Sequence, residues 1–392
     1  MVTLGVLLHM CKFPSSILVR PVTSDVGEVG DVRVHYKARA THRVIMKTNA
    51  SSATVEVKTW SRDSHDLYDY ENTNTAVVNY EVAVPGQLVR NHDIVRFLTG
   101  DETQGSEDVG LVEMIWNQTM CYVKPSRSEL WEVVSQMPGR SLRLVKDMQL
   151  KLGRVRYTVK EVMVTAGNYE ACDTDSSEEE TPAPDLTEAT CRVCYDKESD
   201  RHNPLLSHCK CDGSVKYTHL LCLKQWLRSK VVTKTTDTSI TYQWKCLECE
   251  ICKTELPLTL RDRGMHFSLF DVDRPQSPHL VLESFPSERS ATKSMHVIFI
   301  ETKSEVKLGR GHESDVRIND ISVSRLHAII KYEDGLFRLE DNNSKFGTLV
   351  QVLAPLHVVG SVALQAGRSL IRVECKDRAE GLRNGWREVP SS

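Results

Sequence analysis

The sequence predicts a mainly β, multidomain protein that carries a small, metal-stabilised α+β finger. Three observations support this prediction. The chain has 392 residues, which at about 150 residues per domain suggests two or three domains. Runs of alternating polar and apolar residues, typical of strands with one buried face, occupy the first part of the chain and return after residue 280. Eight of the twelve cysteines lie between Cys191 and Cys252, and such clustering indicates metal ligands in a reducing compartment.

Residues 1–168 are expected to form a β-rich domain, because runs such as "ATVEVKTW" and "GRVRYTVKEVMV" alternate as strands do. One short helix is expected in "SRSELWEVVSQM", with Ser126 or Ser128 as its N-cap. The Leu-Gly-Arg at 152–154 repeats a Leu-Gly-Arg found later in the chain, but no Ser-x-x-His follows it before the cysteine cluster. The sequence therefore names no chemistry for this region.

An acidic stretch rich in Ser, Thr and Pro, residues 169–189, is expected to be a linker because it has little apolar surface to bury. A connector is expected at 259–279 and a short tail at 377–392. Thr174 and Thr181 lie among acidic residues of the linker, a context typical of sites for acid-directed kinases.

Residues 190–258 present cysteines and one histidine in closely spaced pairs. In chain order these are Cys191 and Cys194, Cys209 and Cys211, His219 and Cys222, and a last pair drawn from Cys246, Cys249 and Cys252. Two zinc ions need eight such ligands in tetrahedral sets, and a tight turn can bring both members of a pair to one metal. A finger of this size has too small a core to stand alone, and structural zinc contributes about 10–16 kcal/mol per site. Four protein ligands on each ion would make both sites closed and structural.

This cluster resembles the RING-variant family, also called RING-CH, whose members are ubiquitin ligases. The resemblance covers about the length of 190–258 and rests on "CRVC", "NPLLSHCKCDGSVKYTHLLCLKQWL" and "CEICK", which occur in family order. In the family, alternate pairs share a zinc ion in a cross-brace. The resemblance therefore implies one site made by Cys191, Cys194, His219 and Cys222, and a second made by Cys209, Cys211, Cys249 and Cys252.

The last pair stays open at this point, because Cys246 and Cys249 have the same two-residue gap as Cys249 and Cys252. With Trp244 two residues before it, Cys246 also resembles the seventh ligand of a PHD finger, a chromatin-reading zinc fold. The one-residue gap of the second pair, the seven-residue gap before the histidine, and the segments "CLKQWL" and "CEICK" favour the RING variant and leave Cys246 spare.

A RING-type ligase does no covalent chemistry, because it only holds a ubiquitin-loaded conjugating enzyme in a reactive arrangement. By resemblance, the contact surface for the conjugating enzyme comprises Val193, Trp226 and the residues around Pro257. Lys253 follows the final cysteine, where many RING domains keep a cation that contacts ubiquitin. The alternative is that Val193 and Trp226 are merely core residues.

Residues 280–376 resemble the forkhead-associated (FHA) domain, a β-sandwich that binds phosphothreonine. The motifs that carry the resemblance are Gly309-Arg310, Ser324-Arg325-Leu326-His327 and Ser344-Lys345-Phe346-Gly347-Thr348. The resemblance implies a phosphothreonine site made by Arg310, Ser324, Arg325 and Lys345. A phosphate dianion favours such charge-assisted donors when they are fixed on the loops of a rigid scaffold.

Two further positions of this region have implied roles. By resemblance, His327 supports the loops and does not touch the ligand. Many FHA domains have Asn immediately before the final Gly-Thr, where it bonds the ligand backbone, but this chain has Phe346 there. Phosphate capture is therefore expected to persist, whereas the grip on residues that flank the phosphothreonine is in doubt.

Together these motifs predict a phosphorylation-dependent ubiquitin ligase with two structural zinc ions. Its expected partners are a ubiquitin-conjugating enzyme, ubiquitin and a phosphothreonine-containing protein, with the chain's own linker as a further hypothesis. The alternative is a non-catalytic, phosphopeptide-binding zinc scaffold or a PHD-like, chromatin-associated reader. A net charge of −3 argues against nucleic-acid binding, and no apolar run reaches the roughly 18–20 residues of a membrane span. An intracellular, soluble protein of the cytoplasm or nucleus is expected.

Overall fold

The computed structural model describes most of the chain between residues 40 and 375. The described residues are 40–43, 52–61, 66–100, 102, 104–117, 120–164, 189–262, 264–285, 292–301 and 303–375. The linker threonines Thr174 and Thr181 lie outside them. Within them the protein consists mainly of β-strands, as the sequence predicts, and contains one α-helix, α1 (Leu220–Ser229). No helix in this part of the chain is long and apolar enough to cross a membrane.

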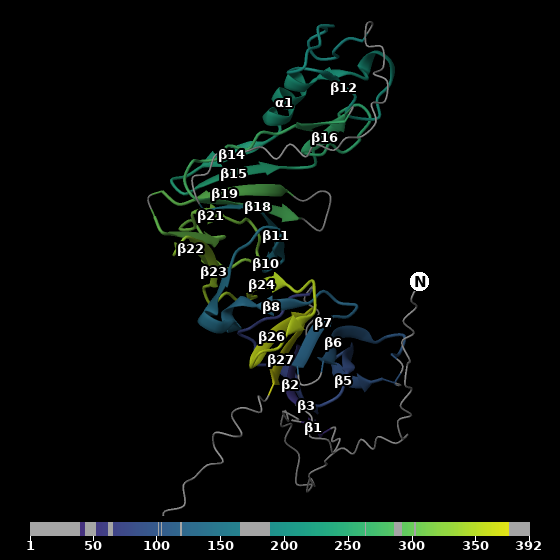
Figure 1. Cartoon of the computed structure of the whole chain (residues 1–392), viewed down its shortest axis with the longest axis vertical. Helices are drawn as coiled ribbons and strands as arrows, with labels where there is room; N and C mark the ends of the chain where they lie inside the picture. Colours follow the sequence, from purple (N-terminus) through teal and green to yellow (C-terminus); the bar gives the residue numbers. More distant parts are fainter. Residues whose placement is uncertain are drawn as a thin grey trace, which may run out of the picture.

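Two β-sandwiches, one above the other in Figure 1, form the body of the molecule. The first, called the N-terminal sandwich, contains β1 (Ala40–Arg43), β2 (Ala53–Trp60), β3 (Thr75–Val82), β4 (Gly86–Asn91), β5 (Ile94–Thr99), β6 (Val109–Asn117), β7 (Met120–Pro125), β8 (Trp131–Val133), β25 (Leu356–His357), β26 (Ser361–Ala366) and β27 (Ser369–Cys375). Its strands have the orders β1-β3-β2-β27-β26-β8 and β25-β7-β6-β4-β5. Its core includes Val55, Leu88, Met114, Leu364 and Ile371.

The second, called the C-terminal sandwich, contains β9 (Ser141–Arg143), β10 (Gln149–Leu152), β11 (Val155–Met163), β18 (His279–Phe285), β19 (Lys293–Phe299), β20 (Glu305–Gly309), β21 (Val316–Arg317), β22 (Ala328–Glu333), β23 (Leu336–Asp341) and β24 (Thr348–Gln351). Its strands have the orders β24-β10-β11-β18-β19 and β21-β20-β22-β23-β9. Its core includes Leu150, Tyr157, Leu282, Ile330 and Phe337. Since β8 pairs with β24, one thirteen-stranded sheet runs through both sandwiches.

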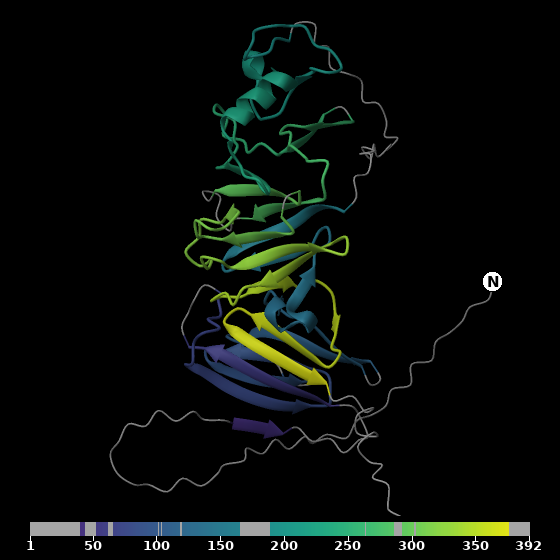
Figure 2. The ribbon, with the colours of Figure 1, turned by 90° about the vertical axis from the view of Figure 1, so that its left-hand side faces the viewer.

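Three strands of each sandwich come from the other half of the chain. β9, β10 and β11 pair with β23, β24 and β18, while β25, β26 and β27 pair with β7, β8 and β2. The sequence assigns these groups to 1–168 and 280–376, but their pairing runs across that division. Figure 2 shows the blue β11 among the green strands of the C-terminal sandwich.

The Leu-Gly-Arg at 152–154 lies at the turn of this exchanged hairpin. Gly153 takes a φ of 61° between β10 and β11, and Gly367 takes a φ of 55° at the matching turn between β26 and β27. The left-handed region suits glycine because it has no Cβ. The segment 152–154 is therefore the structural counterpart of Ala366-Gly367-Arg368 and not of the Leu-Gly-Arg at 308–310.

The prediction of a helix in residues 126–137 is wrong. This segment forms β8 and a 3₁₀ turn, η1 (Val134–Gln136). Trp131 pairs with Gln351 of β24 and with Gln365 of β26, so that β8 is enclosed on both sides by strands. Pairing on both edges imposes an extended backbone and overrides the local helical pattern.

The finger occupies the top of Figure 1 and continues the sheet of the C-terminal sandwich. It contains β12 (Leu205–Leu206), η3 (Gly213–Val215), β13 (Thr218–His219), α1, β14 (Val232–Thr235) and β15 (Ser239–Trp244), and the hairpin of β16 (Thr259–Asp262) and β17 (Met265–Ser268) follows it. β15 pairs antiparallel with β19. On α1, Leu220, Leu223 and Leu227 recur at helical spacing and are buried. They share one core with Val281 and Met295 of the sandwich.

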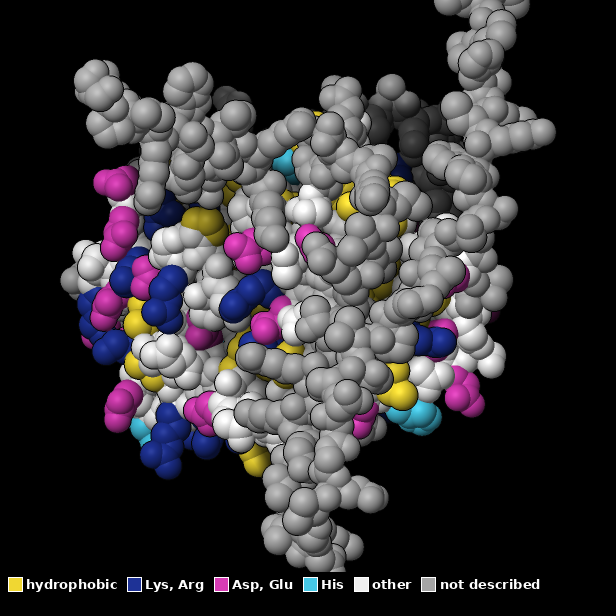
Figure 3. All heavy atoms as spheres, turned by 90° about the horizontal axis from the view of Figure 1, so that it is seen from below, with side chains coloured by type: hydrophobic (Ala, Val, Ile, Leu, Met, Phe, Trp, Pro, Cys, Tyr) yellow, Lys and Arg dark blue, Asp and Glu magenta, His cyan; other side chains and the backbone are white. Residues whose placement is uncertain are grey.

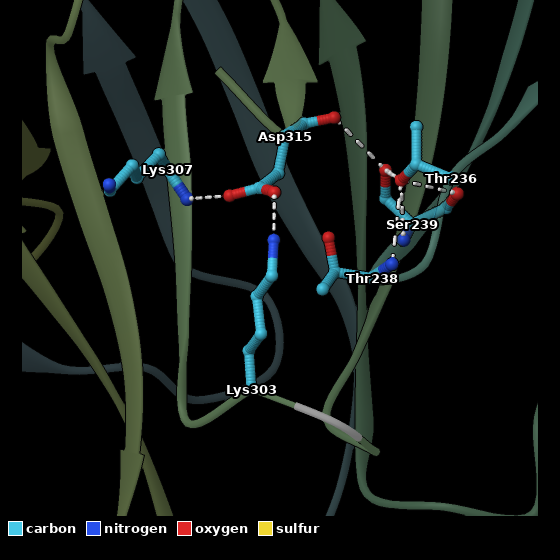
Figure 4. A network of polar contacts seen from close by, with 6 residues as sticks. All are labelled: Thr236, Thr238, Ser239, Lys303, Lys307 and Asp315. Atoms are coloured by element: carbon cyan, nitrogen blue, oxygen red, sulfur yellow. Dashed lines mark hydrogen bonds and ion pairs between the residues drawn. The ribbon is translucent and has the colours of Figure 1, made fainter. Parts of the chain in front are cut away.

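A polar network adds to this junction (Figure 4). The Ser239 hydroxyl donates to the carbonyl of Asp315 at 3.3 Å. The Asp315 carboxylate in turn accepts the backbone N–H of Lys307 at 2.9 Å and pairs with Lys303 at 3.1 Å. The turn of the β14–β15 hairpin is thereby tied to the loop between β20 and β21, which makes the finger and the C-terminal sandwich one continuous unit.

The lower end of the molecule is formed by the N-terminal sandwich and shows mixed charges. On the part of that face that grey atoms leave visible, Lys and Arg side chains alternate with Asp and Glu (Figure 3). Nucleic-acid binding requires a concentrated positive field, and the described side chains visible on this face do not form one.

Candidate functional site

The first of two tetrads in the finger contains Cys191, Cys194, His219 and Cys222. Their ligand atoms lie within 4.8 Å of one another. His219 Nδ1 lies 3.2 Å from the sulfur of Cys194, and His219 Nε2 donates to the carbonyl of Glu198 at 2.7 Å. A metal-binding histidine usually donates its second N–H in this way, which fixes the ring and the tautomer. The free nitrogen therefore faces the three sulfurs.

The second tetrad contains Cys209, Cys211, Cys249 and Cys252, whose sulfurs also lie within 4.8 Å of one another. The sulfurs of Cys211 and Cys249 are 3.6 Å apart. A disulfide would bring two sulfurs to about 2.05 Å, whereas two corners of a tetrahedron with zinc–sulfur bonds of about 2.3 Å are about 3.8 Å apart. The donor set and spacing therefore fit zinc.

Cys246 lies outside both tetrads in the described part of the chain. It follows β15, whose last residue, Trp244, is buried in the core shared by the finger and the C-terminal sandwich. Trp244 thus has a packing role at this junction.

Hydrogen bonds favour thiolates at particular positions. Hydrogen bonding by Thr254 lowers the pKa of Cys252 to about 5. Burial of Cys191 opposes ionisation, but backbone N–H groups, including those of His219 and Val193, lower its pKa to about 7. The thiolate is the form of cysteine that binds metal.

Arg192 connects the two tetrads. It follows the first ligand, Cys191, yet its guanidinium lies 3.6 Å from the sulfur of Cys211 and 3.7 Å from that of Cys249. It also donates to the carbonyl of Val215 at 3.2 Å. Sequence reasoning missed this contact. Arg192 is adjacent to a ligand of the first tetrad, and nothing in the sequence shows that its side chain extends to the sulfurs of the second.

The residues expected to contact a conjugating enzyme have different environments. Val193 is 51% exposed, so it is not a core residue. Lys253 and Pro257 are also exposed. Trp226 on α1 is half-buried against the shared core. The ammonium of Lys230 lies 5.5 Å from the centre of its ring.

The three FHA-like motifs lie on adjoining loops of the C-terminal sandwich, called the ligand loops: residues 309–315, 319–327 and 342–348. The backbone N–H of Arg310 donates to the carbonyl of Ser324 at 3.0 Å, and that of Lys345 donates to the Ser324 hydroxyl at 3.2 Å. A Cβ at Gly309 would collide with the carbonyl of Arg325. Close approach of the first two loops therefore requires glycine at 309.

His327 supports these loops from below. It is fully buried, and its Nδ1 accepts the backbone N–H of Ser324 at 3.1 Å while its Nε2 donates to the carbonyl of Gly347 at 3.1 Å. Burial lowers the pKa of His327, which keeps the ring in the neutral form that these two bonds require.

The predicted phosphate-binding side chains are accessible. Arg310, Arg325 and Lys345 are exposed, and Ser324 is half-buried. The Ser324 hydroxyl accepts a bond from Lys345 and can still donate its own hydrogen. Phe346, which replaces the asparagine common in FHA domains, packs against a cluster with Tyr68 and Trp131 at the boundary of the two sandwiches.

Comparison with known families matches both regions. The RING-variant domain family matches residues 191–252, and the FHA domain family matches residues 306–370.

Similar curated proteins include ubiquitin ligases. E3 ubiquitin-protein ligase MARCHF7 of Rattus norvegicus is 37% identical over 92 residues, which are 24% of this chain and 12% of the relative. ERAD-associated E3 ubiquitin-protein ligase DOA10 of Saccharomyces cerevisiae is 36% identical over 106 residues, or 27% of this chain and 7% of the relative. E3 ubiquitin-protein ligase MARCHF8 of Xenopus tropicalis is 25% identical over 151 residues, or 38% and 52%. The chain thus spans about an eighth or less of the first two relatives.

Among solved structures, the crystal structure of Mycobacterium tuberculosis Rv1747 FHA-1 matches with 16% identity and a TM-score of 0.14, covering 26% of this chain and all of that one. The family matches and the geometry agree on two modules. The chain contains a RING-variant finger, with two Cys/His tetrads compatible with two zinc ions, followed by an FHA domain.

Proposed function

We propose that this protein is a RING-type ubiquitin ligase that selects its partners by binding phosphothreonine. One observation carries the proposal: the finger and the ligand loops belong to a single continuous unit. β15 of the finger pairs with β19 of the C-terminal sandwich, and both share one apolar core. A bound phosphoprotein would therefore be held at a fixed position relative to the finger, which raises its effective concentration there.

Two structural zinc ions would be held by the two tetrads, with Cys246 outside them. A zinc ion bound by four protein ligands supplies folding energy and leaves no position for a reactive water. Arg192 would add a positive charge beside the second tetrad, where four thiolates around one divalent ion leave a net negative charge.

The surface for the conjugating enzyme would comprise Val193, Trp226 and Pro257, with Lys253 toward ubiquitin. The exposure of Val193 supports this assignment, because an apolar side chain fixed in a zinc loop and open to solvent suits a protein contact. Lys230 and Glu250, which pair at 2.8 Å, stand beside Trp226 and would hold its ring in place.

Phosphothreonine would bind to Arg310, Ser324, Arg325 and Lys345. The guanidinium of Arg310 has no hydrogen-bond or ion-pair partner in the described residues, so it is available to a ligand. Arginine can hold a phosphate through two parallel hydrogen bonds.

Self-ubiquitination with a panel of conjugating enzymes tests the ligase half of the proposal. Val193→Ala should abolish transfer while zinc content and thermal stability persist. Trp226→Ala should also abolish transfer and retain zinc, but it should lower thermal stability because the ring packs against the shared core. Val232→Ala, at a 67% exposed valine on β14, is the matched control and should transfer as the wild type does. Absence of transfer with every conjugating enzyme would reduce the protein to a non-catalytic zinc scaffold.

Metal analysis separates the two ligand assignments. Cys246→Ser should retain two zinc ions per chain, whereas Cys252→Ser should lose one. The opposite result would favour the PHD-like arrangement and a chromatin-associated role.

A further inference from the structure

The two sandwiches share one arrangement of nine strands, and each adds a further strand at the edge of its smaller sheet. Outward from the centre of the large sheet, the order β8-β26-β27-β2-β3 in one corresponds to β24-β10-β11-β18-β19 in the other. The facing sheets correspond as β25-β7-β6-β4 to β9-β23-β22-β20, whereas the edge strands differ in direction: β5 is antiparallel to β4, and β21 is parallel to β20. Each copy has exchanged its last three strands for those of the other. The ligand loops are therefore completed by residues from the N-terminal half of the chain.

The exchanged hairpin brings Arg154 to the second ligand loop. The backbone N–H of Arg154 donates to the Ser322 hydroxyl at 2.8 Å, two residues before Ser324. Gly153 lies so close to the backbone of Ser322 that a Cβ there would collide with it. The side chain of Arg154 is 43% exposed, and its guanidinium lies 3.6 Å from the carboxylate of Asp320. Arg154 is thus fixed at its backbone and open to solvent at its charged end.

The same exchanged segment brings Arg140 to the third ligand loop. Arg140 ends a short 3₁₀ turn, η2 (Pro138–Arg140), directly before β9. Its guanidinium donates to the side-chain carbonyl of Asn343 at 3.3 Å, two residues before Lys345. Since β9 pairs with β23, this arginine lies at the end of the sandwich where β23 enters the loop.

We propose that Arg140 and Arg154 are specificity-determining residues that bind acidic side chains next to the phosphothreonine. This inference rests on the proposed phosphothreonine binding and names its ligand class: a phosphothreonine in an acidic segment. Arg310, Arg325 and Lys345 would hold the phosphate, and the two exchanged arginines would extend the positive surface on either side. Two carboxylates pair with these cations, Asp69 with Lys345 and Asp320 with Arg154.

The corresponding arginine of the other sandwich has a different role. Arg368 follows Gly367 as Arg154 follows Gly153, but its guanidinium donates to the carbonyls of Trp60 and His92 and pairs with Asp93 at 2.6 Å. It is therefore used inside the protein. Only in the C-terminal sandwich does the exchanged turn present its arginine to solvent beside ligand loops.

Fluorescence anisotropy on the full chain tests the inference. The probes are labelled phosphothreonine peptides in which each of the three positions on either side of the phosphothreonine is Asp or Asn. Arg154→Gln should weaken binding of the preferred Asp peptide about tenfold, the loss of one charge-assisted contact. Binding of the matched Asn peptide should change less than twofold. Arg140→Gln should likewise weaken binding of an Asp peptide more than binding of its Asn counterpart, but for an acidic residue at a different peptide position.

Lys160→Gln is the matched control. Lys160 lies on the same hairpin and pairs with Glu283 at 3.0 Å, but it is six residues along β11 from the turn, about 20 Å away. It should leave both peptides unaffected. Equal weakening of the Asp and Asn peptides by Arg154→Gln would overturn the inference, since that pattern indicates general attraction or a disturbed loop.

A double variant separates direct contact from neutralisation of Asp320. In Arg154→Gln with Asp320→Asn, the asparagine oxygen can still accept the bonds from Ser322. Continued loss of Asp-peptide preference supports direct contact, and full recovery overturns it. If wild-type protein binds phosphothreonine peptides without preference for Asp, this inference fails and the proposed function survives. If it binds no phosphothreonine peptide, both fail.

Discussion

The two sandwiches carry an arginine at matching places and use it differently. Leu308-Gly309-Arg310 closes β20, and Leu88-Val89-Arg90 lies near the end of β4. In the C-terminal sandwich, Gly309 lets the next loop approach and Arg310 stays exposed. In the N-terminal sandwich, Arg90 donates to the Ser369 hydroxyl at 2.9 Å.

This difference shows that the same strand arrangement can serve two different roles. The shared nine-stranded arrangement can be kept while the loops at its end change from ligand binding to internal support. In the N-terminal copy, both Arg90 and Arg368 are engaged by the protein itself. Both side chains are also half-buried, unlike the exposed cations beside the ligand loops. A half-buried cation held by protein groups offers little to a phosphate, because it must first give up those bonds. We therefore expect the C-terminal copy alone to bind ligand, with the N-terminal copy as its structural complement.

Zinc removal should have the largest effect and should divide the two sandwiches. Structural zinc contributes about 10–16 kcal/mol per site, so a strong chelator should unfold the finger. Hydrogen exchange should then rise in β15 and in β19, its partner in the C-terminal sandwich, while β2 and β3 stay protected. Equal loss of protection in both sandwiches would contradict the prediction that zinc removal acts mainly on the C-terminal sandwich.

The second largest effect should come from substitution of the two matching arginines, Arg310 and Arg90. Arg310→Ala should weaken phosphothreonine-peptide binding about a hundredfold, because a bidentate, charge-assisted contact is lost. Arg90→Ala should leave binding unchanged and lower stability instead, since it removes a bond to Ser369. Anisotropy and thermal unfolding of the same two variants measure both effects. Weakened binding in Arg90→Ala would show that the N-terminal copy also contributes to the ligand site.

Acid should weaken the C-terminal side of the molecule. The buried histidines of the described residues all lie in the finger or the C-terminal sandwich, and they are His208, His219, His279, His296 and His327. His296 contacts Thr241 of the finger and Ser294 at 3.0 Å each. Burial lowers its pKa from 6.5 to about 4.

The direction of the pH effect on stability follows from this lowered pKa. The unfolded chain takes up the proton first, so the contribution of His296 is complete above about pH 6.5 and is lost as the pH falls toward 4. Between about pH 7 and pH 5 this costs about 2 kcal/mol of unfolding free energy. Urea denaturation at saturating zinc measures it. His296→Gln should shrink the difference between the two pH values by that amount, and an unchanged difference would rule out His296 as its source.

The features of the molecule that depend on short segments could be predicted from the sequence. The spacing of the cysteine pairs indicates a metal cluster, and the resemblance to the RING-variant family implies which pairs come together. The three FHA-like motifs in the same way indicate which loops adjoin, because these features depend on short segments on a rigid scaffold. It could not show that β11 lies beside β18, since alternating burial predicts a strand but not its partner. The hairpins β10–β11 and β26–β27 carry the same turn and the same pattern, so nothing local distinguishes exchange from its absence.

Two further outcomes depended on tertiary packing. Trp131 lies in a segment with a helical pattern, yet strands on both sides make it extended. Phe346 departs from the FHA pattern, and the reason appears only when the cluster that contains Tyr68 and Trp131 of the N-terminal half is placed against it. In each case the deciding neighbour is more than sixty residues away in the sequence.

The smallest expected effect concerns Asp69, through which the N-terminal half restrains the ligand loops. Its carboxylate lies 3.3 Å from the ammonium of Lys345, and the neighbouring Tyr70 N–H donates to the Lys345 carbonyl at 3.0 Å. A phosphate must compete with Asp69 for this cation. Since partly exposed ion pairs contribute about 0.2–1 kcal/mol, Asp69→Asn should strengthen phosphothreonine-peptide binding by about two- to fivefold.

Asp93→Asn is the control for this prediction, because Asp93 pairs with Arg368 in the N-terminal sandwich, on an arginine not expected to bind ligand. It should leave peptide affinity unchanged. The gain in Asp69→Asn should shrink as salt is added, since screening weakens the attraction between Lys345 and both of its competing anions. Weaker binding in Asp69→Asn would mean that the carboxylate orients Lys345 toward the ligand. The N-terminal half would then assist the ligand loops at this contact and not restrain them.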